Sequence, residues 1–162
     1  MRYCPTCSSP LTEKEIDTRV RLVCTSPTCE YVYWNNPIPV VAMIVEHDDG
    51  KIILAHNAAW PEGIFSIITG FLESGEAPEE AAKRETKEEL GLDTKEISFV
   101  GVFPFARLNQ LMLCYHIKAT GAIVLNDELD DYKLIEKEEL SGYKKSKKFE
   151  VDGWLKNRSV LE

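Results

Sequence analysis

Runs of apolar residues mark the strands of a sheet in the middle of the chain. Residues 40–45 are all apolar, which is typical of a strand buried on both faces. The Asp-Asp-Gly sequence at residues 48–50 is a strong turn signal, and residues 51–55 form a second apolar run, so the two runs predict a hairpin. A third run, at residues 64–68, predicts another short strand.

Beyond this run the pattern changes to that of a helix. Residues 79–90 are rich in strong helix formers, Pro78 suits an early helical position, and Gly91 supplies a helix stop. Later strands are expected at residues 97–105, 111–119 and 122–125, and a terminal helix at residues 149–156. Strands and helices mixed in this order predict an α/β sandwich, in which a sheet carries helices on both faces.

Length and composition limit what this sheet can belong to. The 162 residues suffice for one ordinary domain and a small appendage, but not for two full cores. No apolar run approaches a membrane span and the N-terminus lacks a secretory signal, so we expect a cytoplasmic protein without a membrane partner. The net charge of -8 disfavours nonspecific binding to nucleic-acid backbones.

Cysteine spacing predicts a metal site near the N-terminus. Four of the five cysteines form two short knuckles, at Cys4, Cys7, Cys24 and Cys29. This is the pattern of four thiolates around one tetrahedral zinc ion, and the alternative, disulfide pairing, is disfavoured by a cytoplasmic redox poise. We expect a zinc ribbon over residues 1–35 and the main domain over residues 36–162. Between the knuckles, residues 15–23 predict a hairpin arm with too few apolar residues to fold without the metal.

The remaining cysteine, the histidines and a lysine run receive simpler interpretations. Cys114 lies in an apolar stretch and is expected to be a buried small hydrophobe. The histidines lack motif spacing and are expected to be structural; they are His47, His56 and His116. Residues 144–148 are rich in lysine and predict a solvated segment, with contact to phosphate as the alternative.

Three glutamates on the expected helix are spaced to share a metal ion. Glu85, Glu88 and Glu89 stand at positions i, i+3 and i+4, so their side chains project from one face. Like charges this close are costly unless a cation compensates them, and carboxylate oxygens suit Mg²⁺ or Mn²⁺. The alternative is a solvated acidic helix. Arg84 could reach back to Glu76 and lock the preceding loop against the helix.

The longer string around these glutamates resembles the Nudix box. Residues 70–92 contain Gly, five residues, Glu, seven residues, Arg-Glu, a position that is usually aliphatic, one residue, Glu-Glu, one residue, Gly and an aliphatic residue. All seven fixed positions match, and Thr86 departs by standing at the usual aliphatic position. The resemblance implies a Nudix hydrolase with an α/β/α sandwich fold, preceded here by the zinc ribbon.

The resemblance also implies the chemistry of the site. In similar enzymes the glutamates matching Glu85, Glu88 and Glu89 hold the divalent metal, often with a backbone carbonyl near Thr69 or Gly70, and water attacks a diphosphate.

The general base is left open between Glu85 and a carboxylate of the acidic residues 127–131. By its spacing, Asp131 best fits the acid that some relatives add to the metal shell, and the alternative is an exposed loop charge.

A four-cysteine ribbon before a Nudix domain is similar to the NADH pyrophosphatase branch, and to enzymes acting on FAD or ADP-ribose. The resemblance implies substrate contact by Trp34, or by Tyr33 beside it, and adenine stacking by Phe71, with core packing as the alternative for both. The NADH-specific signature after the box is matched only in part by residues 102–112. Within that stretch we expect substrate contact from Phe105, Arg107 and Gln110, and the alternative is a polar loop between strands.

The implied activity is hydrolysis of the diphosphate linkage in a dinucleotide such as NADH, NAD, FAD or ADP-ribose, with release of mononucleotides. Two alternatives stay open: a zinc-ribbon module that binds a nucleotide or RNA, and a hydrolase that removes nucleotide caps from RNA. Similar enzymes commonly dimerise, so a homodimer is an implied partner.

Overall fold

The computed structural model describes residues 1–140, which include two compact units. The first unit comprises Met1–Pro37 and the second begins at Ile38. The expected terminal helix at residues 149–156 and the lysine run at residues 144–148 lie outside the described residues. Among the described residues, no helix is both long and apolar enough to cross a membrane.

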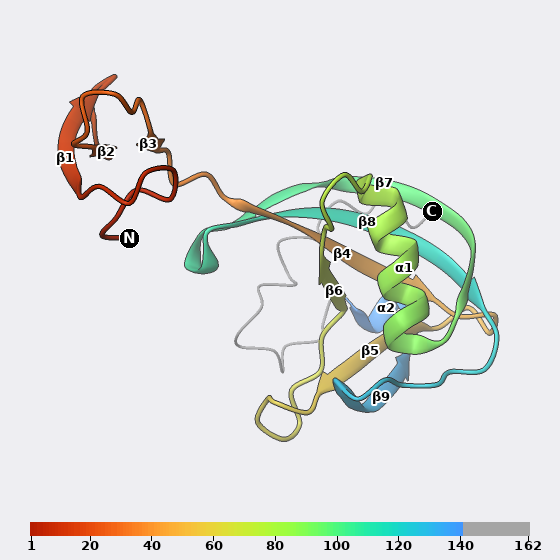
Figure 1. Cartoon of the computed structure of the whole chain (residues 1–162). Helices are drawn as coiled ribbons and strands as arrows, with labels where there is room; N and C mark the ends of the chain where they lie inside the picture. The colour runs from red at the N-terminus through yellow and green to blue at the C-terminus, as the bar shows by residue number, and fades with distance from the viewer. Residues whose placement is uncertain (141–162) are drawn as a thin grey trace. The chain divides into compact units, whose positions relative to one another are not determined.

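The first unit is a small antiparallel sheet with almost no core. Its strands pair in the order β1 (Leu11–Ile16), β2 (Arg19–Cys24) and β3 (Val32–Tyr33) (Figure 1). Two residues with positive φ, Asp17 and Thr18, form the turn between β1 and β2, so the predicted arm at residues 15–23 is the tip of a longer hairpin. Cys4 is the only buried residue of this unit. The unit therefore lacks an apolar core of its own, as the sequence predicts.

The second unit is built on one mixed sheet. Its strands follow the order β7-β8-β4-β5-β9, and β6 pairs with the N-terminal half of β4 (Figure 1). The strands are β4 (Ile38–Glu46), β5 (Ile52–Asn57), β6 (Ile68–Phe71), β7 (Asp93–Phe105), β8 (Gln110–Thr120) and β9 (Leu129–Ile135). β4 and β8 are parallel, and the other pairs are antiparallel. The predicted hairpin of β4 and β5 is confirmed.

The helix α1 (Pro78–Leu90) covers one face of this sheet (Figure 1). Pro78 stands at its start, and Gly91 ends it in the left-handed conformation at φ 70° with its N–H bonded to the Lys87 carbonyl, as predicted. Ala81 and Ala82 are fully buried against the sheet. A 3₁₀ turn (Ala106–Leu108) and the short α2 (Lys137–Leu140) complete the described elements.

The core has two layers because β4 is buried on both faces. Val41, Met43 and Val45 belong to the layer that contains the buried residues of α1, while Val40 and Ile44 belong to the opposite layer. This alternation confirms the interpretation of the continuous apolar run. The opposite layer also contains Cys114, which is fully buried, as expected for a small hydrophobe.

The strand predicted at residues 64–68 is displaced. Only Ile68 belongs to β6, and Ser66 forms an isolated bridge with Ala55 instead. The ladder between β6 and β4 begins at the Ile68–Met43 pair because Val45 and Glu46 of β4 pair with β5 instead.

The strand predicted at residues 122–125 is also wrong. Val124 donates its N–H to the Leu90 carbonyl (2.9 Å) and Asn126 donates to the Glu89 carbonyl (3.3 Å). The segment thus satisfies carbonyls that the end of α1 leaves open, and does not join the sheet. The strand that follows, β9, was missed because only Leu129 and Ile135 at its two ends are buried.

Candidate active site

The three predicted metal-binding glutamates lie on one stretch of α1 with different exposure. The Glu85 side chain is 13% exposed and that of Glu88 is 55% exposed, while Glu89 is buried. Burial, together with the charges of Glu85 and Glu128, raises the pKa of Glu89 to about 8. Burial also raises the pKa of Glu85. The helix therefore holds carboxylates whose ionised forms need a compensating positive charge.

Gly70 on β6 lies directly against one of these side chains. A Cβ at this position would lie 2.1 Å from Cδ and 2.3 Å from Oε1 of Glu85. No residue with a side chain fits there unless Glu85 moves, which explains the first glycine of the motif. The close approach places the Gly70 backbone beside the Glu85 carboxylate.

Arg84 joins the loop before α1 to the glutamates. Its Nε and Nη2 donate to the two carboxylate oxygens of Glu76 at 2.8 and 2.9 Å, which lowers the pKa of Glu76 to about 2. Nη2 also donates to the Phe71 carbonyl (3.0 Å), and Nη1 donates to Glu85 (2.9 Å) and Glu88 (3.1 Å). The guanidinium thus makes the contact to Glu76 that the sequence suggests, and it also holds two of the metal-binding candidates.

These groups fit a hard divalent cation by chemistry, although the carboxylates are not gathered at one point. Among the described residues, only the cysteine cluster has three or more ligand atoms that all lie within 4.8 Å of one another. The glutamates repel one another, and Arg84 draws Glu85 and Glu88 toward itself. The buried carboxylate of Glu89, the carboxylate of Glu85 and the backbone of Gly70 nevertheless offer oxygen atoms of the kind that bind Mg²⁺ or Mn²⁺.

Glu128 is the functional candidate that the sequence did not single out. Its charge raises the pKa of both Glu85 and Glu89, so it lies within electrostatic reach of the cluster. Asp131, which the spacing favoured, is exposed on β9 in register with His56, and its carboxylate accepts a bond from the Tyr132 N–H. Both belong to the same acidic stretch. Spacing alone does not separate these two residues, because the sequence does not show that β9 begins at Leu129.

The four cysteines of the first unit are brought together. The Sγ atoms of Cys4 and Cys29 are 3.8 Å apart and those of Cys7 and Cys24 are 3.4 Å apart. A tetrahedron of thiolates about 2.3 Å from zinc has edges of about 3.8 Å, whereas a disulfide requires about 2.05 Å. All five cysteines are free, so the disulfide alternative is not what the structure shows. The cluster can hold one metal ion.

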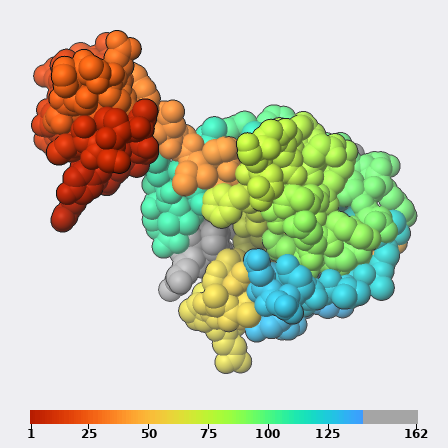
Figure 2. Space-filling model, in the orientation of Figure 1, coloured from red at the N-terminus to blue at the C-terminus, as the bar shows by residue number. Residues whose placement is uncertain are grey.

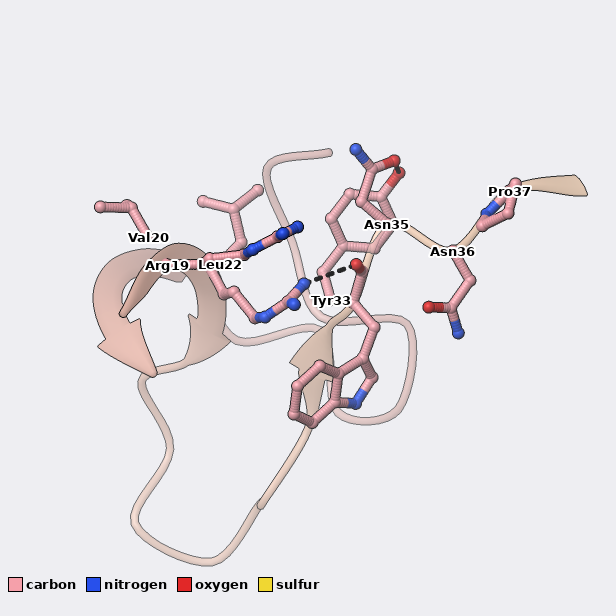
Figure 3. A pocket seen from close by; sticks show the side chains of 9 residues that line it. Arg19, Val20, Leu22, Tyr33, Asn35, Asn36 and Pro37 are labelled. Atoms are coloured by element: carbon pink, nitrogen blue, oxygen red, sulfur yellow. Dashed lines mark hydrogen bonds between the residues drawn. The ribbon is translucent and has the colours of Figure 1, made fainter. Parts of the chain in front are cut away.

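Trp34 lies in the first unit, beside a hollow of about 520 Å³. Figure 3 shows the side chains that line it, which are Arg19, Val20, Arg21, Leu22, Tyr33, Trp34, Asn35, Asn36 and Pro37. The Arg21 guanidinium lies 4.7 Å from the Trp34 ring centroid and donates to the Trp34 carbonyl (2.7 Å). Trp34 is 47% exposed, so it is not a core residue.

The other substrate-contact candidates lie at the end of the sheet where β4 and β8 begin. Phe71 and Gln110 pair with β4 at Val40 and Ile38, on opposite sides of that strand. Phe105 pairs with Gln110, and Arg107 lies 5.7 Å over the Phe105 ring. Phe71 is 57% exposed, which excludes core packing as its role.

The chain belongs to the NUDIX family, whose domain model matches residues 36–155. The NAD-capped RNA hydrolase of Schizosaccharomyces pombe is 31% identical over 156 residues, covering 85% of this chain and 40% of that protein. The NAD-capped RNA hydrolase NudC of Vibrio atlanticus is 31% identical over 134 residues, covering 81% of this chain and 48% of that protein. The chain thus spans less than half the length of these curated relatives.

Solved structures show the same fold. A NUDIX hydrolase from Nitrosomonas europaea superposes with a TM-score of 0.73 at 26% identity, over 86% of this chain and 80% of that one. The predicted fold class is therefore confirmed.

Proposed function

We propose that residues 36–162 form a hydrolase that cleaves the diphosphate linkage of a nucleoside-diphosphate derivative, with Mg²⁺ or Mn²⁺ held by Glu85, Glu88 and Glu89. The substrate is a dinucleotide such as NADH, NAD, FAD or ADP-ribose, and the products are mononucleotides. The observation that carries this proposal is the row of carboxylates on one stretch of α1, in which Glu89 is buried and Glu85 packs against the bare backbone of Gly70. Membership of the NUDIX family and the similarity to NAD-capped RNA hydrolases support it.

Each residue of the cluster has a separate task in this proposal. When bound, the cation neutralises the diphosphate and lowers the pKa of the attacking water. Glu89 gains most from the cation, because a nearby positive charge favours its ionised form and opposes the effect of burial. Arg84 keeps Glu76 and the loop after β6 fixed to the helix. Glu85 and Glu128 are the candidates for the base.

The sheet edge at the start of β4 is suited to the rest of the substrate. Phe71 offers an exposed aromatic face for a base, and Arg107, which lies over the core-packed ring of Phe105, offers a guanidinium for a phosphate. Gln110 at the start of β8 can hydrogen-bond a ribose.

Turnover of a nucleotide panel tests the proposal. Purified protein is incubated with Mg²⁺ or Mn²⁺ and NADH, NAD, FAD, ADP-ribose, dinucleoside polyphosphates or nucleoside triphosphates, and the mononucleotides released are identified. Loss of several kcal/mol of charge stabilisation in Glu89→Gln should lower kcat by about a hundredfold or more. Glu80→Gln is the matched control, because Glu80 lies on the same helix but is exposed and pairs with Lys83. Turnover that Glu89→Gln leaves unchanged would exclude the proposed site.

Removal of a nucleotide cap from RNA is a second candidate function. The relatives' names favour it, and so does the hollow in the first unit, where Arg19 and Arg21 stand beside Tyr33 and Trp34. Aromatic rings and arginines side by side suit the bases and phosphates of a single strand. Arg19→Ala should then lower kcat/KM for NAD-capped RNA and leave that for free NAD unchanged. Equal effects on both substrates would argue for a free dinucleotide.

We further propose that the cysteine cluster holds a structural zinc ion in a ribbon over residues 1–35. Two observations support this role: the distances between the thiols, and the absence of any buried residue other than Cys4 in Met1–Pro37. Four free thiols fit a cytoplasmic location, where thiols remain reduced.

A further inference from the structure

A buried histidine outside the glutamate helix joins two segments of the second unit. His56 lies near the end of β5, where the register between β5 and β9 shifts, and is 8% exposed. Its Nδ1 lies 2.5 Å from Asp130 Oδ1, and its Nε2 lies 3.2 Å from the Pro61 carbonyl oxygen. Because both partners accept hydrogen bonds, both ring nitrogens of His56 donate.

These two bonds tie the loop of residues 58–65 to the start of β9. Figure 2 shows this loop, in yellow, against the blue surface of β9. Phe65 packs on His56 with ring centroids 5.6 Å apart, and Lys133 Nζ lies 3.9 Å from the Phe65 centroid. The His56 ring is therefore enclosed by the loop and anchored on β9.

Glu128 lies two residues before Asp130 and is held by backbone hydrogen bonds to two other segments. Ala58, two residues after His56, donates its N–H to the Glu128 carbonyl at 2.9 Å. From the other side, the Glu128 N–H donates to Asn126 Oδ1 (3.1 Å), and Asn126 donates to the Glu89 carbonyl (3.3 Å). Glu128 is thus anchored to the end of α1 through Asn126 and to the segment just after β5 by the Ala58 N–H, and it stands two residues before Asp130, the partner of His56.

We propose that His56 is a positioning residue for the metal site, because its bond to Asp130 fixes the start of β9 and so keeps Glu128 at the end of α1 that carries Glu89. The inference rests on the proposed function in one respect, that these glutamates bind the cation. His56 itself touches neither cation nor substrate. It acts only through the backbone between Asp130 and Glu128.

Mn²⁺ affinity, measured by isothermal titration calorimetry on the zinc-loaded full chain without nucleotide, tests this role. In His56→Gln the amide nitrogen stands near the former Nε2 and still reaches Pro61, but it cannot donate to Asp130. In His56→Asn the amide nitrogen stands near the former Nδ1 and keeps that bond. We expect Mn²⁺ binding to weaken about fivefold to tenfold in His56→Gln and less than about twofold in His56→Asn.

A double-mutant cycle with Glu128→Gln identifies the route of the effect. If His56 acts through Glu128, His56→Gln should cause no further loss of Mn²⁺ affinity once Glu128→Gln is present. Equal losses in both backgrounds would overturn the proposal, and so would a Glu128→Gln variant with unchanged affinity.

Two further variants guard against a trivial folding effect. Asp130→Ala removes the exposed partner of His56 and should reproduce the loss even if His56→Gln folds poorly. His116→Gln is the matched control, since His116 is also 8% exposed and bonded to a carboxylate, Glu46, and within residues 1–140 that bond does not lead to Glu128. A loss in His116→Gln equal to that in His56→Gln would contradict the proposal.

Calorimetry also separates this inference from the proposed function. Wild-type protein that binds Mn²⁺ but cleaves no nucleotide would refute the activity and leave the role of His56 open to the same cycle. Turnover with no difference in Mn²⁺ affinity between His56→Gln and wild type would support the activity and refute the role of His56.

Discussion

Individual residues around the glutamates are constrained by their immediate neighbours. Gly70 has no room for a side chain because Glu85 fills the space, and Arg84 has donors directed at Glu76, Glu85 and Glu88. The sequence motif predicts the contacts of these residues because the contacts are local and lie within one loop and one helix. Glu128 is held by contacts with Ala58 and Asn126 in other segments, and local spacing could not distinguish it from its acidic neighbours.

Gly70→Ala should disable the metal site with little effect on the fold. A methyl group 2.1 Å from Glu85 Cδ must displace that side chain, which can rotate away because it is partly exposed. We expect Mn²⁺ affinity to fall about tenfold or more, while the melting temperature changes by only a few degrees. In a Glu85→Ala background the same change should cost no additional affinity. An additional loss there would mean that Gly70 serves some purpose other than making room for Glu85.

His56 should make stability depend on pH. Its hydrogen bond to Asp130 raises the pKa of His56 above the ordinary value of 6.5. The bond therefore contributes its full stabilisation below about pH 6.5, and this contribution disappears as pH rises through the folded-state pKa. In urea denaturation, the difference between wild type and His56→Gln should be largest near about pH 5.5 and should shrink by about pH 9. A difference that grows with pH would show that His56 is neutral in the folded protein.

At the scale of helices and strands, the sequence correctly predicts the features that depend on local signals. The bounds of α1 follow from Pro78 and Gly91, and the burial of β4 follows from its unbroken apolar run. The segment at residues 122–125 looks like a strand by its apolar residues, but its backbone bonds to the end of α1. β9 looks like a loop because its central residues are exposed and charged at an edge of the sheet. Both errors arise because tertiary partners decided the conformation.

Thr86 offers a test of how α1 packs on the sheet. It is fully buried at the position that is usually aliphatic in the family, and its hydroxyl donates to the Ala82 carbonyl at 2.7 Å. Thr86→Val removes a buried hydroxyl whose bond to the preceding turn contributes little, so we expect an increase in unfolding free energy of about 0.5–1 kcal/mol. Thr86→Ser keeps the hydroxyl but loses the methyl group, and should cost about 1 kcal/mol. Thermal melts of the pair measure both, and destabilisation by Thr86→Val would show that the hydroxyl bond matters more than its burial.

At the scale of the whole molecule, the two units differ in whether an apolar core can stabilise them. The second unit has a layered apolar core on both faces of β4, whereas the first unit buries only Cys4. The sequence predicts this contrast, because apolar runs begin only at residue 40 and four cysteines fall before residue 30. It does not reveal the hollow beside Trp34, which arises only when β2 and the segment after β3 come together.

Because the first unit lacks an apolar core, its fold should depend on the zinc ion proposed for its cysteine cluster. Cys4→Ser removes one of four thiolates, so we expect zinc content to fall from about one ion per chain to nearly none and the amide NMR signals of residues 1–37 to collapse toward random-coil values. Signals from the sheet around β4 should stay dispersed, since that unit has its own core. Cys114→Ala is the matched control: it removes a buried thiol of the second unit, so zinc should stay bound while the melting temperature of that unit falls. Unchanged zinc content in Cys4→Ser would rule out a four-thiolate site. A dispersed spectrum without zinc would show instead that the β1–β2–β3 sheet is stable on its own hydrogen bonds.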